Sequence, residues 1–366
     1  MSTVVVKVGS SSLTDDAGAI QRAAIEAISA EVASLRAHGH AVLVVSSGAI
    51  ASGVAALGLR YRPSDMPTLQ ALAAAGQSRL VHEWNEALAG HGYVGAQVLL
   101  VPHDFVNRRQ YLHARQTLTR LLELGCVPVI NENDAIAADE IRFGDNDRMA
   151  ALVAHLVGAD VLVLLTDTPG LYTADPRSDP AARLVEEVRA DDPILQVDAG
   201  GSGTNRGSGG MASKLLAARI ASWSGVQAVI AQAGRPGVLV DALAGAPGVG
   251  TVFRAHDRHL PARKLWIAFA AGTDGRVVVD EGARTALVER GTSLLPAGVR
   301  AVDGAFVEGD IVDVAGPDGQ VFARGMAAVD ADTLRSVAGR RTAELPADLP
   351  HEAVHRDDLV LLVGMG

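Results

Sequence analysis

Val4-Val5-Val6-Lys7-Val8-Gly9-Ser10-Ser11-Ser12 is the stretch that decides the fold: an apolar, β-branched run that ends in glycine and hydroxyl residues. A run of this length, bounded by turn residues, predicts a buried β-strand. Similar runs recur along the chain, at residues 41–45, 95–101, 127–130, 161–165 and 226–231. Amphipathic helical patterns lie between them, including residues 20–37, 69–88 and 116–124. This alternation predicts an α/β fold, a mainly parallel sheet covered by helices on both faces, with the ligand site beyond the carboxyl ends of its strands.

The length of 366 residues predicts two domains, because a single hydrophobic core rarely keeps growing to this size. The pattern changes near residue 270, where Gly275-Arg276-Val277-Val278-Val279-Asp280 begins a series of short alternating segments broken by Gly, Asp and Pro. These segments predict a small β-rich domain. Residues 265–269, just before it, are apolar enough to form a packed strand. We therefore expect an α/β domain over residues 1–260, a connection over 261–273, the β-rich domain over 274–352 and a C-terminal tail over 353–366.

Composition and charge limit the possible functions. With 48% hydrophobic residues and a formal net charge of −10, the chain is expected to be a soluble protein with no general attraction to nucleic acid or anionic membranes. Its first apolar run is interrupted by Lys7 and is too short for a signal peptide or a membrane span, so we expect a cytoplasmic location. Cys126 is the only cysteine, which excludes a disulfide framework within the chain. No histidine pair has the spacing of a zinc site, and we name no protein residue as a metal ligand.

Two lysines lie beside glycine-rich segments that suit phosphate binding. Lys7 interrupts a predicted buried strand, where an ammonium group is costly unless it has a partner; the alternative is an edge strand with Lys7 in water. The segment of residues 200–214, rich in Gly and Ser, ends in Lys214 at the start of a helical pattern. Such a segment can bind phosphate through backbone N–H groups and the lysine, although a disordered surface loop has the same composition. Ser213 occupies the position where a Walker A motif requires glycine, and residues 207–212 match GxGxxA but follow no strand.

Polar residues follow three other predicted strands. The second run ends in Ser46-Ser47-Gly48, where small residues allow close backbone approach to a ligand. Asn131-Glu132-Asn133-Asp134 follows the fourth run, and Gly144-Asp145-Asn146-Asp147 precedes a helical pattern over residues 148–156. A single Asx residue there would be a helix cap, whereas several indicate a polar ligand, Mg²⁺ or lysines that they contact. Thr166-Asp167 follows the fifth run and leads into a Pro-Gly turn, which suits either a structural turn or contact with a nucleotide.

Taken in order, these motifs resemble those of the glutamate 5-kinase family within the amino acid kinase superfamily, and residues 274–352 resemble the PUA domain of its bacterial members. The resemblance implies an αβα sandwich (the amino acid kinase fold) followed by a PUA-like domain. It implies transfer of the γ-phosphoryl group of ATP, with Mg²⁺, to the side-chain carboxylate of L-glutamate, the first step of proline biosynthesis. It also implies feedback inhibition by L-proline and a homo-oligomer.

The resemblance assigns roles to individual residues. Lys7 and Lys214 would be catalytic and bracket the phosphoryl group, with Asp147 holding both ammonium groups. Ser47, Asp134 and Asn146 would bind glutamate. Besides Lys7, the residues that would contact ATP are Thr166, Asp167, Ser208, Gly209, Gly210, Met211, Ala212, Ser213 and Lys214. The attacking carboxylate is already anionic at neutral pH, so no general base is required.

Two alternatives stay open. Other members of the superfamily phosphorylate related carboxylates or carbamate, and the fold alone does not choose among them. PUA domains elsewhere bind RNA, which would make the chain an RNA-binding protein. Residues 274–349 contain eight Arg, no Lys and thirteen Asp or Glu, a net charge of −5 that suits phosphates poorly.

Overall fold

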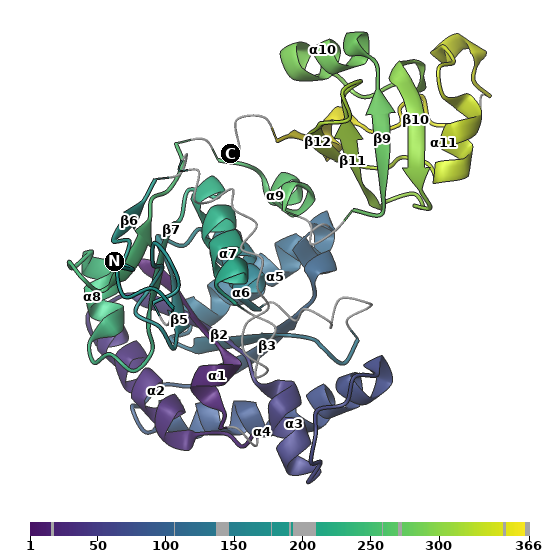
Figure 1. Cartoon of the computed structure of the whole chain (residues 1–366). Helices are drawn as coiled ribbons and strands as arrows, with labels where there is room; N and C mark the ends of the chain where they lie inside the picture. The colour runs from purple at the N-terminus through teal and green to yellow at the C-terminus, as the bar shows by residue number, and fades with distance from the viewer. Residues whose placement is uncertain are drawn as a thin grey trace. The chain divides into compact units, whose positions relative to one another are not determined.

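A computed structural model covers all 366 residues and describes all of them except 16–17, 106, 137–145, 177, 190–191, 193–209, 258, 270–272, 347–348 and 363–366. The chain forms two compact units, Met1–His259 and Leu260–Gly366 (Figure 1). None of the described helices is both long and apolar enough to cross a membrane.

The first unit contains an eight-stranded sheet with the strand order β3-β4-β2-β1-β5-β7-β8-β6. Neighbouring strands are parallel except for the antiparallel pair β7 and β8, which confirms the predicted mainly parallel sheet. The six predicted runs form β1, β2, β3, β4, β5 and β7, whereas the short strands β6 and β8 were not predicted. The strands are β1 (Thr3–Val8), β2 (Ala41–Ser46), β3 (Gly95–Leu100), β4 (Val127–Glu132), β5 (Val161–Thr166), β6 (Glu187–Val188), β7 (Gln227–Gln232) and β8 (Gly250–Phe253).

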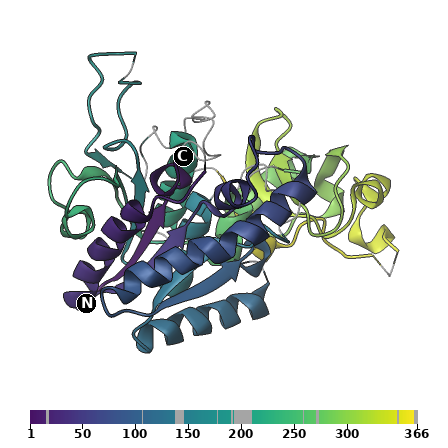
Figure 2. The same cartoon turned by 90° about the horizontal axis from the view of Figure 1, so that it is seen from below.

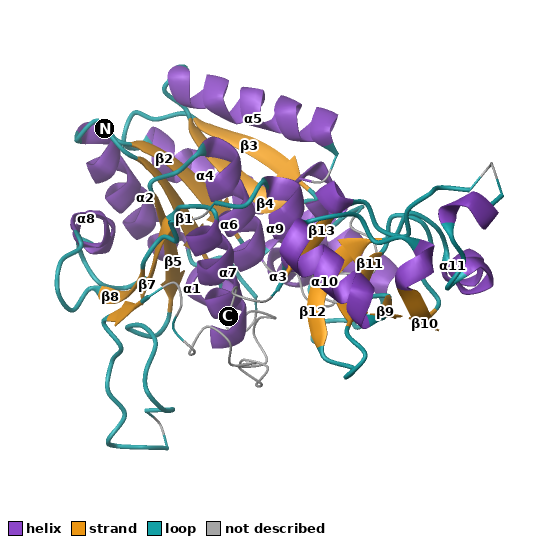
Figure 3. Cartoon of the chain, turned by 90° about the horizontal axis from the view of Figure 1, so that it is seen from above, coloured by secondary structure: helices purple, strands orange, loops and turns teal. Residues whose placement is uncertain are grey.

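Helices cover both faces of this sheet. α2 and α4 lie on one face, seen in Figure 2, and α6 and α7 lie on the other, seen in Figure 3. Side chains alternate along a strand, and Val4, Val6 and Val8 of β1 pack with residues of α2 and α4. Lys7 therefore points to the face of α6 and α7. The helices are α1 (Ser10–Leu13), α2 (Arg22–Ala37), α3 (Ala49–Ala56), α4 (Met66–Ala89), α5 (Arg108–Glu123), α6 (Asn146–Val157), α7 (Met211–Trp223) and α8 (Val238–Ala244), with a 3₁₀ turn η1 (Pro102–Phe105).

α5 begins well before the predicted residues 116–124. Its N-cap is Asn107, whose Oδ1 accepts hydrogen bonds from the backbone N–H groups of Arg109 and Gln110 at 3.0 and 3.2 Å. The first two turns are largely polar and exposed, so the hydrophobic pattern showed only the second half of the helix.

The second unit contains the predicted β-rich domain. Its five strands have the order β10-β9-β11-β12-β13; β9 and β11 are parallel and the other pairs antiparallel. The strands are β9 (Gly275–Val279), β10 (Val299–Gly304), β11 (Ile311–Ala315), β12 (Val321–Met326) and β13 (Leu359–Leu361). The helices and 3₁₀ turns are α9 (Ala262–Ala268), α10 (Glu281–Arg290), η4 (Pro296–Gly298), α11 (Ala331–Val337), η5 (Thr342–Glu344) and η6 (Arg356–Asp358).

Residues 265–269, which are apolar enough for a packed strand, are instead helical, because this segment lies in α9 and its C-cap. Pro261 precedes the helix, and the Ala-Arg-Lys that follows favours a helical first turn. α9 packs against β12 and β13 through buried apolar side chains, and the Arg324 guanidinium donates to the backbone carbonyl of Ala268 at 3.1 Å. Residues 262–268 are thus part of the second unit, as is β13, which lies in the range expected to be a tail.

Candidate active site

Lys7 lies on a central strand, which excludes the edge-strand alternative. β1 runs between β2 and β5, and Lys7 pairs in register with Val45 on one side and Leu164 on the other. Its side chain is 5% exposed, and its Nζ lies 2.6 Å from Asp147 Oδ1. A buried ammonium group is stable when it is paired in this way.

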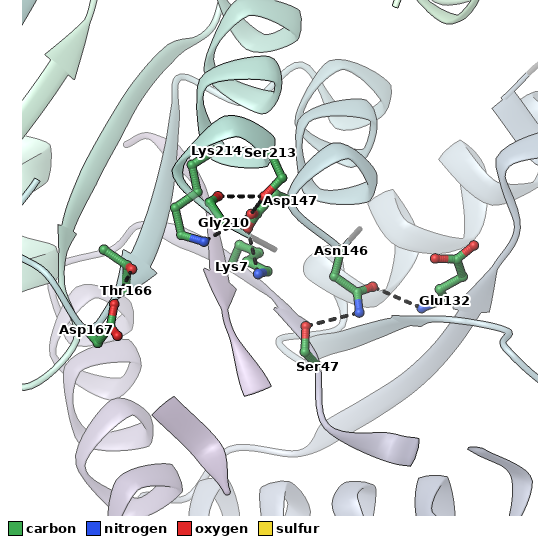
Figure 4. Close-up of polar contacts among 10 residues, drawn as sticks. All are labelled: Lys7, Ser47, Glu132, Asn146, Asp147, Thr166, Asp167, Gly210, Ser213 and Lys214. Atoms are coloured by element: carbon green, nitrogen blue, oxygen red, sulfur yellow. Dashed lines mark hydrogen bonds and ion pairs between the residues drawn. The ribbon is translucent and has the colours of Figure 1, made fainter. Parts of the chain in front are cut away.

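Asp147 is the centre of a cluster that three separate elements build (Figure 4). It lies in the first turn of α6, is fully buried, and contacts both lysines. Lys214, in the first turn of α7, has its Nζ 3.1 Å from Asp147 Oδ2. The Ser213 hydroxyl donates to the same oxygen at 2.7 Å and lies 2.9 Å from the carbonyl oxygen of Gly210. The structure thus brings Lys7, Asp147 and Lys214 together, as the family resemblance implied, and adds Ser213 to them.

The electrostatics of this cluster favour an anion. Burial alone would raise the pKa of Asp147, but the neighbouring ammonium groups of Lys7 and Lys214 lower it to about 2. The carboxylate is therefore ionised at neutral pH. Within the described part of this cluster, two ammonium groups share the single carboxylate of Asp147, which leaves one excess positive charge. A transferring phosphoryl group is an anion of the kind that such a site stabilises.

Asn146, next to Asp147, belongs to a second group of polar contacts. Successive side chains of a helix point about 100° apart, so the two residues face different directions. Asn146 Nδ2 donates to Ser47 Oγ at 3.1 Å, and Asn146 Oδ1 accepts from the backbone N–H of Glu132 at 3.3 Å. Ser47 follows β2, and Gly48 after it has a φ of +106°, which turns the chain into α3. Ser47 and Asn146, both predicted, therefore meet across 99 residues of sequence.

Asp134, the third residue predicted to bind glutamate, lies in the turn after β4. It is 8% exposed, and burial raises its pKa to about 6, while the nearby Arg62 acts in the opposite direction. It lies two residues beyond Glu132, whose N–H contacts Asn146. A desolvated carboxyl group of this kind gains most from an incoming cation, such as an α-ammonium group.

Thr166 and Asp167 lie at the end of β5, on the other side of the lysine pair from Ser47 in Figure 4. The Thr166 hydroxyl donates to Asp167 Oδ1 at 3.0 Å, and Asp167 is exposed. The turn that follows is held by Thr251 of β8, whose Oγ1 accepts from the N–H of Leu171 at 2.8 Å and donates to the Val185 carbonyl at 2.6 Å. Sequence analysis missed Thr251, because it is distant in sequence and carries no motif.

Of the glycine-rich segment of residues 200–214, the structure describes only the part from Gly210 onward. Ser208 and Gly209 lie outside the described residues. Gly210 is the N-cap of α7 and has no side chain to occupy the first N–H groups, and Met211 and Ala212 form the first, partly exposed turn. A helix start of this kind can donate backbone N–H groups to a phosphate.

The strand order arranges these groups in a line. Asp134 and Ser47 follow β4 and β2, Lys7 lies on β1, and Thr166 and Asp167 lie at the end of β5. The lysine pair therefore lies between one polar group suited to a small acceptor and another suited to a nucleotide. Among the described residues, no three His, Cys, Asp or Glu side chains are placed to share a metal ion.

Comparison with known proteins shows the family to which the chain belongs. Residues 2–232 match the amino acid kinase family, and residues 275–349 match the PUA domain. The glutamate 5-kinase of Myxococcus xanthus (strain DK1622) is 50% identical, over 98% of this chain and 96% of the relative. The glutamate 5-kinase of Frankia casuarinae is also 50% identical, with the same coverage. A structure of Giardia lamblia carbamate kinase bound to AMP-PNP aligns with a TM-score of 0.50 and 17% identity, over 69% of this chain and 98% of that chain, which supports the fold alone. The chain therefore belongs to the amino acid kinase family, to its glutamate 5-kinase branch, and carries a C-terminal PUA domain.

Proposed function

We propose that this chain transfers the γ-phosphoryl group of ATP to the side-chain carboxylate of L-glutamate, giving L-glutamyl 5-phosphate in the first step of proline biosynthesis. The observation that carries the proposal is the buried Lys7–Asp147–Lys214 cluster between the Ser47–Asn146 pair and the Thr166–Asp167 pair. Glutamate 5-kinases that are 50% identical over nearly the whole chain support it.

In the proposed reaction, a glutamate carboxylate oxygen attacks the γ-phosphorus, and the bond between this phosphorus and the β,γ-bridging oxygen breaks to release ADP. Lys7 and Lys214 stabilise the charge on the phosphoryl oxygens throughout. Asp147, which contacts both ammonium groups, positions them before the substrates arrive. Phosphoryl transfer depends mainly on positioning and charge stabilisation, which such a cluster supplies.

For glutamate recognition, we propose that Asp134 accepts hydrogen bonds from the α-ammonium group, while Ser47 and Asn146 donate to carboxylate oxygens. The incoming ammonium group would offset the desolvation that raises the pKa of Asp134. Ser47 and Asn146 contact each other and so present their donors in a fixed relation.

For ATP, we propose contacts from Thr166, Asp167 and the segment of residues 208–214, with N–H groups at the start of α7 on the phosphates. Mg²⁺ prefers oxygen ligands and retains several waters. Both oxygens of Asp147 contact lysines, and the described residues offer no carboxylate cage. We propose that the nucleotide phosphates would hold Mg²⁺, which would neutralise part of their charge.

The decisive experiment is ADP release by the purified chain with ATP, Mg²⁺ and a panel of acceptors: L-glutamate, L-aspartate, acetylglutamate and carbamate. We expect L-glutamate to give the highest kcat/KM, and trapping with hydroxylamine should give the γ-hydroxamate. If the chain preferred carbamate or another carboxylate, that acceptor would replace glutamate in the proposed function. The assignment to the amino acid kinase family would stand.

We propose that free L-proline inhibits the enzyme by competing with glutamate, because proline has the α-ammonium and α-carboxylate but lacks the side-chain carboxylate. Initial rates against glutamate at several proline concentrations should show that glutamate relieves the inhibition. The Asp134→Ala variant should lose sensitivity to proline together with affinity for glutamate. Inhibition that glutamate does not relieve would contradict a shared site.

We further propose a homo-oligomer in the cytoplasm. Leu57, Leu59 and Tyr61, in the connection between α3 and α4, are exposed apolar side chains of the kind that association covers. Light scattering coupled to gel filtration should give a multiple of the 37.8 kDa chain mass, and the chain mass alone would contradict the proposal.

A further inference from the structure

We infer that α4, which carries none of the groups proposed to touch substrate, sets the affinity for glutamate through two positioning residues, Gln77 and Trp84. The inference rests on the proposed function. The two residues are seven positions apart, two turns of helix, and so lie on one side of α4. From there, each contacts the end of a different strand of the sheet.

Gln77 begins a chain of hydrogen bonds that ends at Ser47. Its Oε1 accepts from Asn131 Nδ2 at 2.7 Å, and Asn131 Oδ1 accepts from the backbone N–H of Glu132 at 3.0 Å. The same N–H lies 3.3 Å from Asn146 Oδ1, and Asn146 Nδ2 donates to Ser47 Oγ at 3.1 Å. Two of the glutamate-binding residues are therefore linked to α4 through the end of β4. Figure 4 shows the last two of these contacts.

Trp84 contacts the segment Ser46-Ser47 at the end of β2, called the serine loop below. Its indole Nε1–H donates to Ser46 Oγ at 2.9 Å, and both side chains are completely buried. Ser46 Oγ in turn lies 3.3 Å from the carbonyl oxygen of Ser47. The contacts thus form a closed ring that leaves α4 at Gln77, passes through Asn146 and Ser47, and returns to α4 at Trp84.

α4 holds a fixed position relative to α3, because the backbones of the two helices are in direct contact. A Cβ at Gly76 would lie 1.9 Å from the carbonyl oxygen of Ala49, and a Cβ at Gly53 would lie 2.0 Å from that of Leu72. α3 begins directly after Ser47 and Gly48, so the loop that carries Ser47 is fixed at its far end by this contact. Small displacements of α4 therefore reach the glutamate site.

Loss of either anchor leaves a buried polar group without its partner and allows the serine loop to move. In Gln77→Ala, the Asn131 amide loses its acceptor; in Trp84→Phe, only the indole N–H is lost and most of the bulk remains. A net hydrogen bond corresponds to a factor of about ten in binding. We expect each variant to raise the KM for glutamate about tenfold, with kcat and the KM for ATP changed less than about threefold.

The experiment compares wild type, Gln77→Ala and Trp84→Phe with Ser78→Ala, a control on an exposed position of the same helix. In an Asn131→Ala background, Gln77→Ala should add nothing, because its partner is already gone, whereas Trp84→Phe should still raise the KM. An unchanged glutamate KM in Gln77→Ala, or equal rises in both KM values, would overturn the inference.

A second measurement does not depend on activity. Exchange of the backbone amide hydrogens in a peptide spanning residues 127–134 should be faster in Gln77→Ala than in Ser78→Ala, because Asn131, which accepts from the Glu132 N–H, is no longer oriented by Gln77. Equal exchange in these two variants would overturn the network, even if wild type proved not to phosphorylate glutamate. A wild type without glutamate-dependent ADP release would overturn the proposed function instead. If Trp84→Phe fails to fold, the glutamate KM and the amide exchange of Gln77→Ala test the inference by themselves.

Discussion

Two neighbouring regions of the active site differ in how they use charge, although they share the first turn of α6. The transfer region, Lys7, Asp147 and Lys214, consists of full charges with contacts of 2.6 to 3.1 Å in a buried place. In the acceptor region, the contacts of Ser47 and Asn146 join neutral donors and acceptors.

The acceptor region also contains Asp134, a carboxyl group whose pKa burial raises to about 6, whereas the lysines lower that of Asp147 to about 2. Asp147 is thus charged before substrate arrives, whereas Asp134, under the proposed function, gains its stabilising cation from the substrate. We infer that the transfer region is preorganised and insensitive to pH, while the acceptor region responds to pH and to ligand.

The largest effect is expected from Lys214→Met, which removes an ammonium group from the transfer region. kcat should fall about 10³-fold, with little change in the KM for glutamate, because the contact matters most in the transition state. The chain has only three lysines, Lys7, Lys214 and Lys264, and Lys264→Met in the second unit is the matched control. A near-normal kcat in steady-state assays of Lys214→Met would remove it from the mechanism.

Asp134→Ala should have the complementary signature in the acceptor region. The KM for glutamate should rise about tenfold to a hundredfold, the range for a hydrogen bond to a charged group, while the KM for ATP stays close to wild type. Asp241→Ala, on α8, serves as a control carboxylate that pairs with Arg235. A rise in the KM for ATP instead would move Asp134 to the nucleotide side.

The pH dependence sharpens the contrast between the two carboxylates. As pH falls through about 6, Asp134 takes up a proton and the KM for glutamate should rise, whereas kcat should not follow Asp147, which ionises near 2. Glutamate itself does not titrate between pH 5 and 7. Asp134→Asn should abolish this pH dependence of the KM, and its persistence in that variant would assign it to another group.

The raised pKa of Asp134 also affects stability, with a definite sign. In the folded state, this carboxyl binds its proton more tightly than in the unfolded state, so its contribution to stability is greatest at low pH and falls as pH rises to about 6. Asp134→Asn avoids the buried charge and should stabilise the ligand-free protein at pH 7.5 by on the order of 1–3 kcal/mol. Thermal unfolding should show a smaller difference in stability between Asp134→Asn and wild type at pH 4.5 than at pH 7.5. A variant less stable than wild type at pH 7.5 would contradict the inference that burial desolvates the Asp134 carboxylate.

The smallest effect is expected from removing the second unit, because all the proposed catalytic and binding residues lie in the first. A chain ending at His259 should keep kcat within about threefold of wild type. A chain ending at residue 272 would retain α9 without β12 and β13, leaving the buried face of Leu265 and Ile267 exposed, and should aggregate more readily. An inactive chain ending at His259 would show that the second unit is required.

Local signals in the sequence account for most of the fold. The six apolar runs predicted the six longest strands of the first sheet, since central strands that are buried on both faces consist of continuous apolar residues. β3, at the edge of the sheet, is apolar although it is only partly buried. The same reasoning failed for β6, which has two residues, and for the helical residues 265–268, whose apolar content fits either structure. It also missed the first half of α5, which is exposed and begins at a polar cap.

The sequence alone determined that Lys7 needed a partner, because a lysine in a buried strand must be paired, and that the segment before α7 suits phosphate. The residue pattern did not decide which carboxylate would serve, and only the family resemblance pointed to Asp147. Asp147 is 140 positions from Lys7 and 67 from Lys214, and only the parallel sheet, which brings the ends of β1, α6 and α7 together, selects it over its neighbours. The roles of Gln77, Trp84 and Thr251 likewise depend on contacts between distant elements. The hydrogen bonds that position a site form between residues that the chain brings together only on folding, so no local pattern predicts them.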